Sequence, residues 1–518
     1  MDAMTLATEV VAPQGWVFPV SFAIYTLGII AVGLYSARFA RRTDEDYFLA
    51  GRSLGPWVAA LSAGASSESG WVTLGLVGLA FANGVQAYWI LPGTLIGIAV
   101  NWFVIAPRLR DRAAEVGAVT IPDFFSFSFR EKLPLLRILT VIVILASMFL
   151  YVAAQIAAAG EAFSSSFSGV SYFGGVLLGA GIVLAYTVVG GFRAACWTDF
   201  VQALVMVGAL AIFPIFLIAH HGGIGFITEN LASVSTSDGG SMLSMDPGKT
   251  GLALLGFLLG SGALGINFGF VGIPHAHVRF MALRDRKEYV AGGMICVVWS
   301  TLIFLGAVTI GLAVRAMAEG GTDWAAPMLT ADNLQSGGEK SLMIAATNML
   351  PGFVSGIVLA AVLSAMASTA DSQLIVAASA GANDLYARLI DRKGRISHGI
   401  VNRLVVVALG VGAVIAVMDR EREIYSFVLE YGWAMLGAAF GPQMLLLLLW
   451  KRATYAGCLS GMVVGFVIAI GWKHWYDPEQ FNGVEIYNLT VAFFAAGVTN
   501  IIVSLFTSSR AVFRESPQ

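Results

Sequence analysis

The stretch from Leu61 to Leu76, "LSAGASSESGWVTLGL", decides how this chain folds. Apolar sequence flanks it over a length that can cross a membrane, yet its centre, "ASSESG", holds three serines and Glu68. An ionisable group inside a spanning segment costs about 2.5–3.5 kcal/mol on insertion scales, and such groups mark functional sites. Glycine and serine also weaken helices. We therefore expect a membrane helix that unwinds near Glu68 and lines a site.

The composition of the whole chain is that of a polytopic membrane protein. Of its 518 residues, 57% are hydrophobic and only 12% are charged, with a mean hydropathy of +0.79, whereas soluble domains carry about 25% charged residues. The formal net charge of -2 and the lack of a basic run argue against a nucleic-acid partner. Three scattered cysteines argue against a disulfide framework or a metal cluster. The expected surroundings are membrane lipid, with no obligatory protein partner evident and no cleaved signal peptide at the N-terminus.

A spanning helix needs about 20 mostly apolar residues. Thirteen segments meet this criterion, and we expect spans at 15–37, 56–82, 86–107, 135–163, 170–190, 198–219, 250–273, 288–317, 343–379, 399–418, 424–450, 453–472 and 486–507. Two outer connections, 220–249 and 318–342, are long. The chain, 1–518, therefore reads as a single membrane domain.

The basic residues orient these spans. Lys and Arg concentrate in cytoplasmic loops. With the N-terminus outside and the C-terminus inside, the cytoplasmic loops would hold about four times as many basic residues as the outer ones. One of these inner loops would follow the seventh span and contain Arg279, Arg284 and Arg286. No output module follows the last span, which argues against a transporter-like solute sensor.

The seventh span is interrupted in the same way as the second. Its sequence, "LLGSGALGINFGFVGIPH", is rich in glycine and leads into Pro274. Such glycines can simply let helices pack closely. Two interrupted spans in the two halves of a chain, however, point to a transporter site made by discontinuous helices. We therefore expect two inverted five-helix repeats, spans 2–6 (56–219) and spans 7–11 (250–450), with an extra helix at 15–37 and two C-terminal helices at 453–507.

The ninth span carries oxygen ligands for a cation. Ala365, Ser368, Thr369 and Ser372 share one helical face, and Asp371 lies at its border. Hydroxyls in a buried helix can simply bond its own carbonyls, but beside an intramembrane aspartate we favour a cation site, since hard cations prefer oxygen.

Several longer motifs identify a family. They are "DYFLAGRSLGPWVAALSAGAS", "SGW", "TIPDFF", "YTVVGGFRAACWTDFVQA", "PHAHVRFMA" and "LAAVLSAMASTADSQLIVAAS". With them the chain resembles the bacterial sodium:solute symporters, and within these the sodium/proline symporter branch. The resemblance covers nearly the whole chain. It implies an all-α LeuT-type core, alternating access driven by a sodium gradient, and a multi-pass location in the bacterial inner (plasma) membrane.

The resemblance also implies three sets of site residues. The main sodium ligands would be the carbonyls of Ala65, Glu68 and Ala365 and the hydroxyls of Ser368 and Thr369. A possible second cation site would comprise Asp199, Asp371 and Ser372. The solute would lie near Ser66, Ser67, Ser69, Trp71, Gln155, Ile266, Phe270 and Pro274.

Four positions depart from the proline branch of the family. That branch has an aspartate in place of Ser67 and a methionine in place of Glu68, and it has tryptophan and tyrosine where this chain has Ile266 and Phe270. Losing polar anchors usually changes what a pocket binds. These departures predict another amino acid or a small carboxylate rather than proline.

The sequence therefore predicts a secondary active symporter that couples inward sodium flow to uptake of a small polar solute. A proton-coupled or mixed symporter is the alternative, because a buried Glu68 could carry a proton. A membrane enzyme is not expected, since the chain shows neither a metal-spaced histidine cluster nor a nucleophile motif.

Overall fold

The computed structural model describes residues 15–38, 44–167, 169–236, 239–329, 337–391, 398–418, 428–478 and 484–508. Within these ranges the chain is helical, with two isolated β-bridges and no named strand. Ten of the described helices are long and apolar enough to cross a membrane. This confirms an all-α membrane architecture.

In the first half of the chain the main helices are α2 (Val17–Ala37), α3 (Asp44–Leu49), α4 (Pro56–Ser67), η2 (Trp71–Leu76), α5 (Val77–Asn83), α6 (Ile90–Ala99), η4 (Val100–Ile105), α7 (Ala106–Val116), α8 (Ile121–Ser128), α9 (Leu135–Ser166), α10 (Tyr172–Val207), η5 (Gly208–Ile212), α11 (Phe213–His220) and α12 (Ile224–Leu231). In the second half they are α13 (Gly251–Leu258), η6 (Leu264–Ile266), α14 (Asn267–Phe270), α15 (Pro274–Met281), α16 (Glu288–Glu319), α18 (Ser341–Met349), α19 (Gly352–Ser379), η9 (Ala380–Ile390), α20 (His398–Ala416), η10 (Val428–Trp433), α22 (Ala434–Leu449), α23 (Tyr455–Trp475) and α24 (Asn488–Phe506).

The second span is broken at Glu68, as the sequence predicts. Helix α4 ends at Ser67, Glu68 leaves helical geometry with φ -103° and ψ 77°, and η2 begins at Trp71. Side chains stabilise the break: the Gly70 N–H donates to Gln155 Oε1 at 3.0 Å, and the Trp71 indole N–H donates to the Ser67 carbonyl at 3.2 Å. The unwound backbone is therefore held by protein groups, as a membrane interior requires.

The seventh span is broken over a longer stretch. Helix α13 ends at Leu258, short helices η6 and α14 follow, and α15 starts again with Pro274 in its first turn. A proline is tolerated there because the first helical N–H groups have no partner in the helix. The prediction that Arg279 lies in a loop is wrong: it sits on α15 and is fully buried. Pro274 thus opens a new helix beyond the expected end of the seventh span.

Two other boundaries differ from the expected spans. The fifth and sixth spans form the kinked helix α10, whose halves meet at Gly191 with φ 62° and ψ -171°, a conformation open essentially to glycine alone. The ninth helix begins at Gly352 rather than 343, because Pro351 separates it from α18. Beyond Ser379 it continues through η9 to Ile390.

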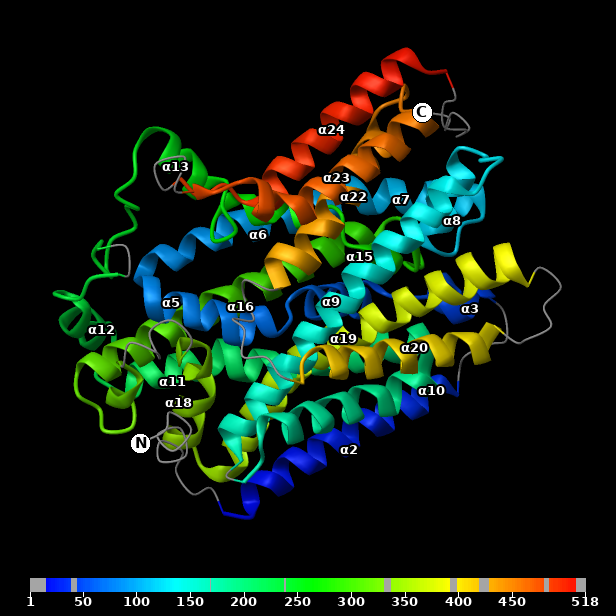
Figure 1. Ribbon diagram of the computed structural model, residues 1–518. Coiled ribbons are helices and arrows are strands. Elements are labelled where there is room, and N and C mark those ends of the chain that lie inside the picture. The colour runs from blue at the N-terminus through cyan, green and yellow to red at the C-terminus, as the bar shows by residue number, and fades with distance from the viewer. Residues whose placement is uncertain are drawn as a thin grey trace.

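Helix α19 is the central helix of the molecule. Every residue from Val358 to Ser379 is buried, and α19 packs against α2, α9 and α10. In Figure 1 the paired helices α2 and α10 run along the lower edge and α23 and α24 along the upper edge, with α9 and α19 between them. The break in the second span also packs against α19, so the polar residues of both elements meet in the interior.

Candidate functional site: buried oxygens between a broken helix and α19

The predicted sodium ligands converge where α4 ends beside α19. The carbonyl of Ala65 accepts a hydrogen bond from Ser368 Oγ at 2.9 Å and from Thr369 Oγ1 at 3.4 Å. The same hydroxyls reach the carbonyl of Ala365 at 3.2 and 3.0 Å. All four residues are fully buried. Two carbonyls and two hydroxyls from different helices thus surround one point in the core.

This set of oxygens suits a small hard cation. Carbonyl and hydroxyl oxygens are hard donors, which monovalent and divalent main-group cations prefer over nitrogen or sulfur. Each hydroxyl can rotate its hydrogen away from a carbonyl and offer a lone pair instead. All four oxygens belong to backbone carbonyls or hydroxyls, so the ligands at this point are uncharged.

The backbone and the side chain of Glu68, the fifth predicted ligand, lie in different surroundings. Its backbone lies at the end of α4, three residues beyond Ala65. Its side chain lines a separate cavity with residues of α6, η4 and α16 rather than the space beside Ser368. The side chain of Glu68 therefore lies outside this group of oxygens, and its carbonyl stays a predicted ligand.

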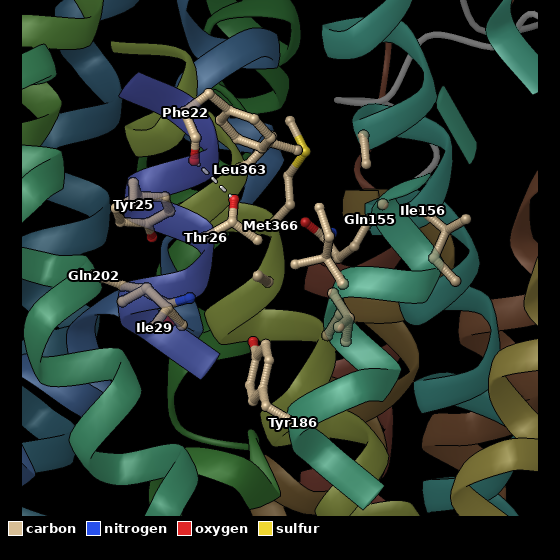
Figure 2. A pocket seen from close by; sticks show the side chains of 16 residues that line it. Phe22, Tyr25, Thr26, Ile29, Gln155, Ile156, Tyr186, Gln202, Leu363 and Met366 are labelled. Atoms are coloured by element: carbon tan, nitrogen blue, oxygen red, sulfur yellow. Dashed lines mark hydrogen bonds between the residues drawn. The ribbon is translucent and has the colours of Figure 1, made fainter. Parts of the chain in front are cut away.

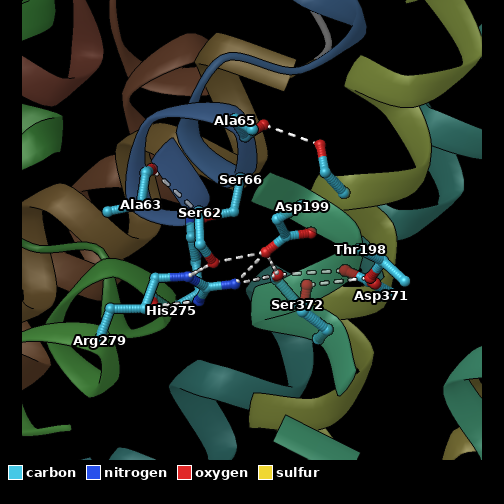
Figure 3. Close-up of polar contacts among 12 residues, drawn as sticks. Ser62, Ala63, Ala65, Ser66, Thr198, Asp199, His275, Arg279, Asp371 and Ser372 are labelled. Atoms are coloured by element: carbon cyan, nitrogen blue, oxygen red, sulfur yellow. Dashed lines mark hydrogen bonds and ion pairs between the residues drawn. The ribbon is translucent and has the colours of Figure 1, made fainter. Parts of the chain in front are cut away.

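The predicted second cation site already contains a positive charge. Arg279 on α15 lies 2.7 Å from Asp199 Oδ2 and donates to Ser372 and, at 2.6 Å, to Ser62 (Figure 3). Ser372 in turn donates to Asp371 Oδ1 at 3.1 Å. Asp199, Asp371 and Ser372 are thus brought together beside the guanidinium of Arg279, and among the described residues Asp199 Oδ1 and Asp371 Oδ2 have no hydrogen-bond partner.

Arg279 and Ser62 were not foreseen as site residues. Arg279 lies in the motif "PHAHVRFMA", directly after the Gly-rich stretch and Pro274, and a proline in a first helical turn was the available signal. Ser62 lies two turns before the break, on the buried helix α4, and nothing in its spacing distinguishes it from a packing residue.

The expected solute residues form two groups. Ser69, Trp71 and Gln155 lie at the break in the second span, where Ser69 Oγ is 3.5 Å from the hydroxyl of Tyr151. Trp71 packs against Phe304 of α16, with ring centroids 5.6 Å apart. The hydroxyls of Ser66 and Ser67 instead donate to the Ala63 carbonyl of their own helix.

The second group lies along the break in the seventh span. Phe270 meets the ring of Trp433 edge to face at 4.7 Å, and the Trp433 indole N–H donates to the Ile266 carbonyl at 3.2 Å. Only glycine allows this approach at position 269, because a Cβ there would lie 1.7 Å from the indole nitrogen. Pro274 starts α15 just beyond. Tyr151 and Trp433 were not predicted, since an aromatic residue in an apolar span looks like core.

A larger cavity lies on the other side of Gln155. It is bounded by α2, α9, α10 and α19, and Figure 2 shows Phe22, Tyr25, Gln155 and Met366 around it. Most of its lining is apolar. Gln155 therefore stands between this cavity and the break in the second span, to whose backbone it is bonded.

Comparison with known proteins places this architecture in a family. Residues 47–465 match the Sodium:solute symporter family. The chain is 34% identical to the "Sodium/proline symporter" of Escherichia coli (strain K12), over 94% of this chain and 92% of that one. It is 35% identical to the "High-affinity proline transporter PutP" of Bacillus subtilis (strain 168), over 90% and 94% of the two chains.

A solved structure shares the fold. It is described as the substrate-bound outward-open state of a Na+-coupled sialic acid symporter with a novel Na+-site. The TM-score is 0.76 at 18% sequence identity, covering 97% of this chain and all of the other. With these matches, the chain belongs to the sodium:solute symporter family, and it is a multi-pass membrane transporter, not an enzyme, that couples the uptake of a small solute to sodium.

Proposed function

We propose that the solute is proline or a closely related small amino acid. The observation that carries this proposal is the 34–35% identity, over nearly the whole chain, to proteins named proline symporters and transporters. It outweighs the departures at Ile266 and Phe270, because these are single positions, whereas the identity extends over nearly the whole chain. The solute would lie between the two breaks, near Ser69, Trp71 and Phe270.

Uptake into proteoliposomes tests this proposal. Radiolabelled proline should accumulate when a sodium gradient is imposed, and should not accumulate when potassium replaces sodium. Competition by unlabelled amino acids and small carboxylates then ranks the solutes. If a small carboxylate competes and proline does not, the departures at Ile266 and Phe270 decide the specificity and the amino-acid proposal is wrong.

We propose that the coupling sodium binds to the carbonyls of Ala65, Glu68 and Ala365 and the hydroxyls of Ser368 and Thr369. The hydrogen bonds from Ser368 and Thr369 to the carbonyls of Ala65 and Ala365 support four of these ligands, and Glu68 is included because it lies at the end of α4, three residues after Ala65. We propose that a second cation binds at Asp199, Asp371 and Ser372 when Arg279 moves away from Asp199, because two positive charges at contact distance repel each other strongly in a buried site.

We further propose the membrane arrangement that the basic residues favour. It has thirteen spans in the bacterial inner membrane, with the N-terminus outside and the C-terminus inside. The broken second and seventh spans then occupy matching places in two inverted repeats, 56–219 and 250–450. Labelling of single cysteines introduced at Gly222 in an outer connection and at Arg286 in an inner one, with a reagent that cannot cross the membrane, tests the orientation: only the first should react in intact cells.

A further inference from the structure

Helix α19 separates two spaces in the core of the protein. The face that carries Ser368 and Ser372 meets α4 and α15. The opposite face lines the cavity between α2, α9, α10 and α19, with residues spaced three and four apart: Leu363, Met366, Ala367 and Ala370. This cavity is therefore distinct from the candidate sodium site, and Gln155 on α9 stands between it and the break in the second span.

The lining of this cavity favours a neutral occupant. The 16 described residues that surround it include no charged side chain. Most of them are aliphatic or aromatic, among them Ile29 on α2, Ile156 on α9 and Val183 on α10. An ion in such surroundings would lose its hydration without gaining a partner of opposite charge, which is very costly. The cavity therefore suits a ligand with a short aliphatic body and no charge.

Three polar atoms at the cavity lack partners. They are Gln155 Nε2, Gln202 Oε1 and the hydroxyl of Tyr186, and each of these side chains is only 1% exposed. In the described part of the chain none of the three atoms has a hydrogen bond. All three side chains line the cavity, and Figure 2 shows the Tyr186 hydroxyl pointing into it. Buried polar atoms without partners are costly, so these atoms indicate a polar group on the occupant.

The chemistry of the three atoms selects that polar group. Gln155 Nε2 can only donate a hydrogen bond, Gln202 Oε1 can only accept one, and the Tyr186 hydroxyl can do either. A primary amide matches this set, because its carbonyl oxygen accepts and its N–H donates. The cavity has room for about two or three water molecules. A short aliphatic amide such as propionamide is therefore a suitable probe.

We propose that the cavity between α2, α9, α10 and α19 is a second ligand site, which binds a small neutral molecule with a short aliphatic body and a primary amide group. Its occupation slows uptake without competition with the transported solute. The binding itself is independent of the proposed function, and only its effect on uptake rests on the proposed sodium-coupled transport of proline.

Gln155 connects this site to the transport machinery. Its Oε1 accepts a hydrogen bond from the Gly70 N–H at 3.0 Å, in the break of the second span. A ligand that accepts a hydrogen bond from Nε2 of the same amide holds the Gln155 side chain in the position that fixes the break. On another side of the cavity Tyr25 of α2 is hydrogen-bonded to Ser364 of α19. A ligand that contacts these helices stabilises the conformation to which it binds, so the change between conformations should become slower.

Thermal unfolding of the purified full-length protein tests binding without any measurement of uptake. Propionamide should stabilise the wild type in a saturable way, and the shift should persist in saturating proline because the two sites are separate. Propionate has a similar shape but carries a negative charge, so it should give no shift. The absence of a shift with propionamide would mean that the cavity holds only water, and the proposal would be wrong. A shift that saturating proline abolishes would place the amide in the solute site and would also overturn the proposal.

Two variants test whether the shift comes from this cavity. Val183→Phe fills the cavity and should abolish the shift. Gln202→Leu keeps the side-chain size but removes one hydrogen-bond acceptor, so the apparent dissociation constant should rise about fivefold; it decides the question if Val183→Phe does not fold. Leu178→Phe is the matched control, because Leu178 lies on the same helix, is 48% exposed and does not line the cavity. Equal shifts in the wild type and in both cavity variants would show that propionamide binds elsewhere.

Uptake into proteoliposomes tests the effect on transport. Propionamide should lower the maximal rate of sodium-driven proline uptake in the wild type and in Leu178→Phe, with little change in the proline concentration for half-maximal uptake, and should have no effect in Val183→Phe. A higher half-maximal proline concentration at an unchanged maximal rate would indicate competition and contradict the proposal. If labelled proline is not transported at all, the proposed solute is wrong, while the unfolding experiment still decides whether the cavity binds an amide.

Discussion

Two polar clusters lie one turn apart on α19, and they differ in how their charge is balanced. The Ser368–Thr369 cluster contains neutral oxygens from α4 and α19 and no charged side chain. The Ser372 cluster contains Asp199 and Asp371, and Arg279 already supplies a positive charge there. The same helix thus presents one cluster of uncharged oxygens and one cluster whose positive charge is part of the protein.

The difference comes from the neighbouring element rather than from α19 itself. Ser368 and Ser372 occupy equivalent faces of the helix, one turn apart. Ser368 faces the backbone carbonyl of Ala65 at the end of α4, whereas Ser372 faces a guanidinium on α15. A hydroxyl on a buried helix therefore does not by itself predict ion binding. The partner across the interface decides what it binds.

The largest expected effect is that of Arg279→Ala. Removing one partner of a buried ion pair leaves an uncompensated charge and costs about 3–5 kcal/mol of stability. Thermal unfolding of the purified variant in sodium-free buffer should show a large loss of stability relative to the wild type. Sodium should restore more stability to Arg279→Ala than to the wild type, because Asp199 and Asp371 can then bind it.

The control for this variant is Arg286→Ala, whose partner Asp111 lies at the surface. Surface ion pairs contribute about 0–1 kcal/mol, so its unfolding should stay close to that of the wild type. If sodium stabilises Arg279→Ala no more than the wild type, the Asp199 cluster is not a latent cation site and the second-site proposal is wrong.

An intermediate effect is expected for Ser368→Ala and Thr369→Ala. Each variant removes one oxygen from the candidate sodium site. The loss of that oxygen should weaken sodium binding by about 1 kcal/mol, so the sodium concentration for half-maximal uptake should rise about fivefold. Thr369→Ser keeps the hydroxyl and should stay near the wild type. Ser379→Ala is a control on the same helix, since within the described part of the chain that hydroxyl bonds the carbonyl of Val376 on its own helix. If the sodium dependence of uptake is unchanged in both alanine variants, Ser368 and Thr369 are not sodium ligands and the assignment is wrong.

The smallest expected effect is that of Ser372→Ala. Its hydroxyl contacts Arg279 and Asp371, and its loss should cost about 1 kcal/mol of stability without changing the sodium dependence of uptake. A rise in the required sodium equal to that of Ser368→Ala would mean that both clusters bind sodium during the cycle, and the contrast between them would disappear.

Local chemistry made much of this architecture predictable. Helix-weakening residues around Glu68 placed the break correctly, and the spacing of Ser368 and Thr369 placed both hydroxyls on the face that meets Ala65. The partner of Ser372 could not be predicted in the same way, because Arg279 comes from a segment 93 residues away along the chain. The direction of the Glu68 side chain was also beyond reach, since a residue at a helix end does not keep the helical angle.

Other features depend on packing between distant segments. Trp433 lies over the break in the seventh span because Gly269 leaves room for its ring, and neither residue indicates the other in sequence. The start of α19 at Gly352 had a local signal in Pro351, because proline often precedes or opens a helix. Pro274 was a similar local signal for α15, the helix that carries Arg279.

The uncharged ligands of the candidate sodium site have an electrical consequence. Ala65, Ala365, Ser368 and Thr369 contribute no charge, so a bound sodium ion leaves that region one positive charge richer. Moving one elementary charge through a membrane potential of 100 mV is worth about 2.3 kcal/mol, which corresponds to a factor of about 50 in accumulation. The voltage across the membrane therefore contributes to solute uptake alongside the sodium concentration difference, and depolarisation alone should slow the protein.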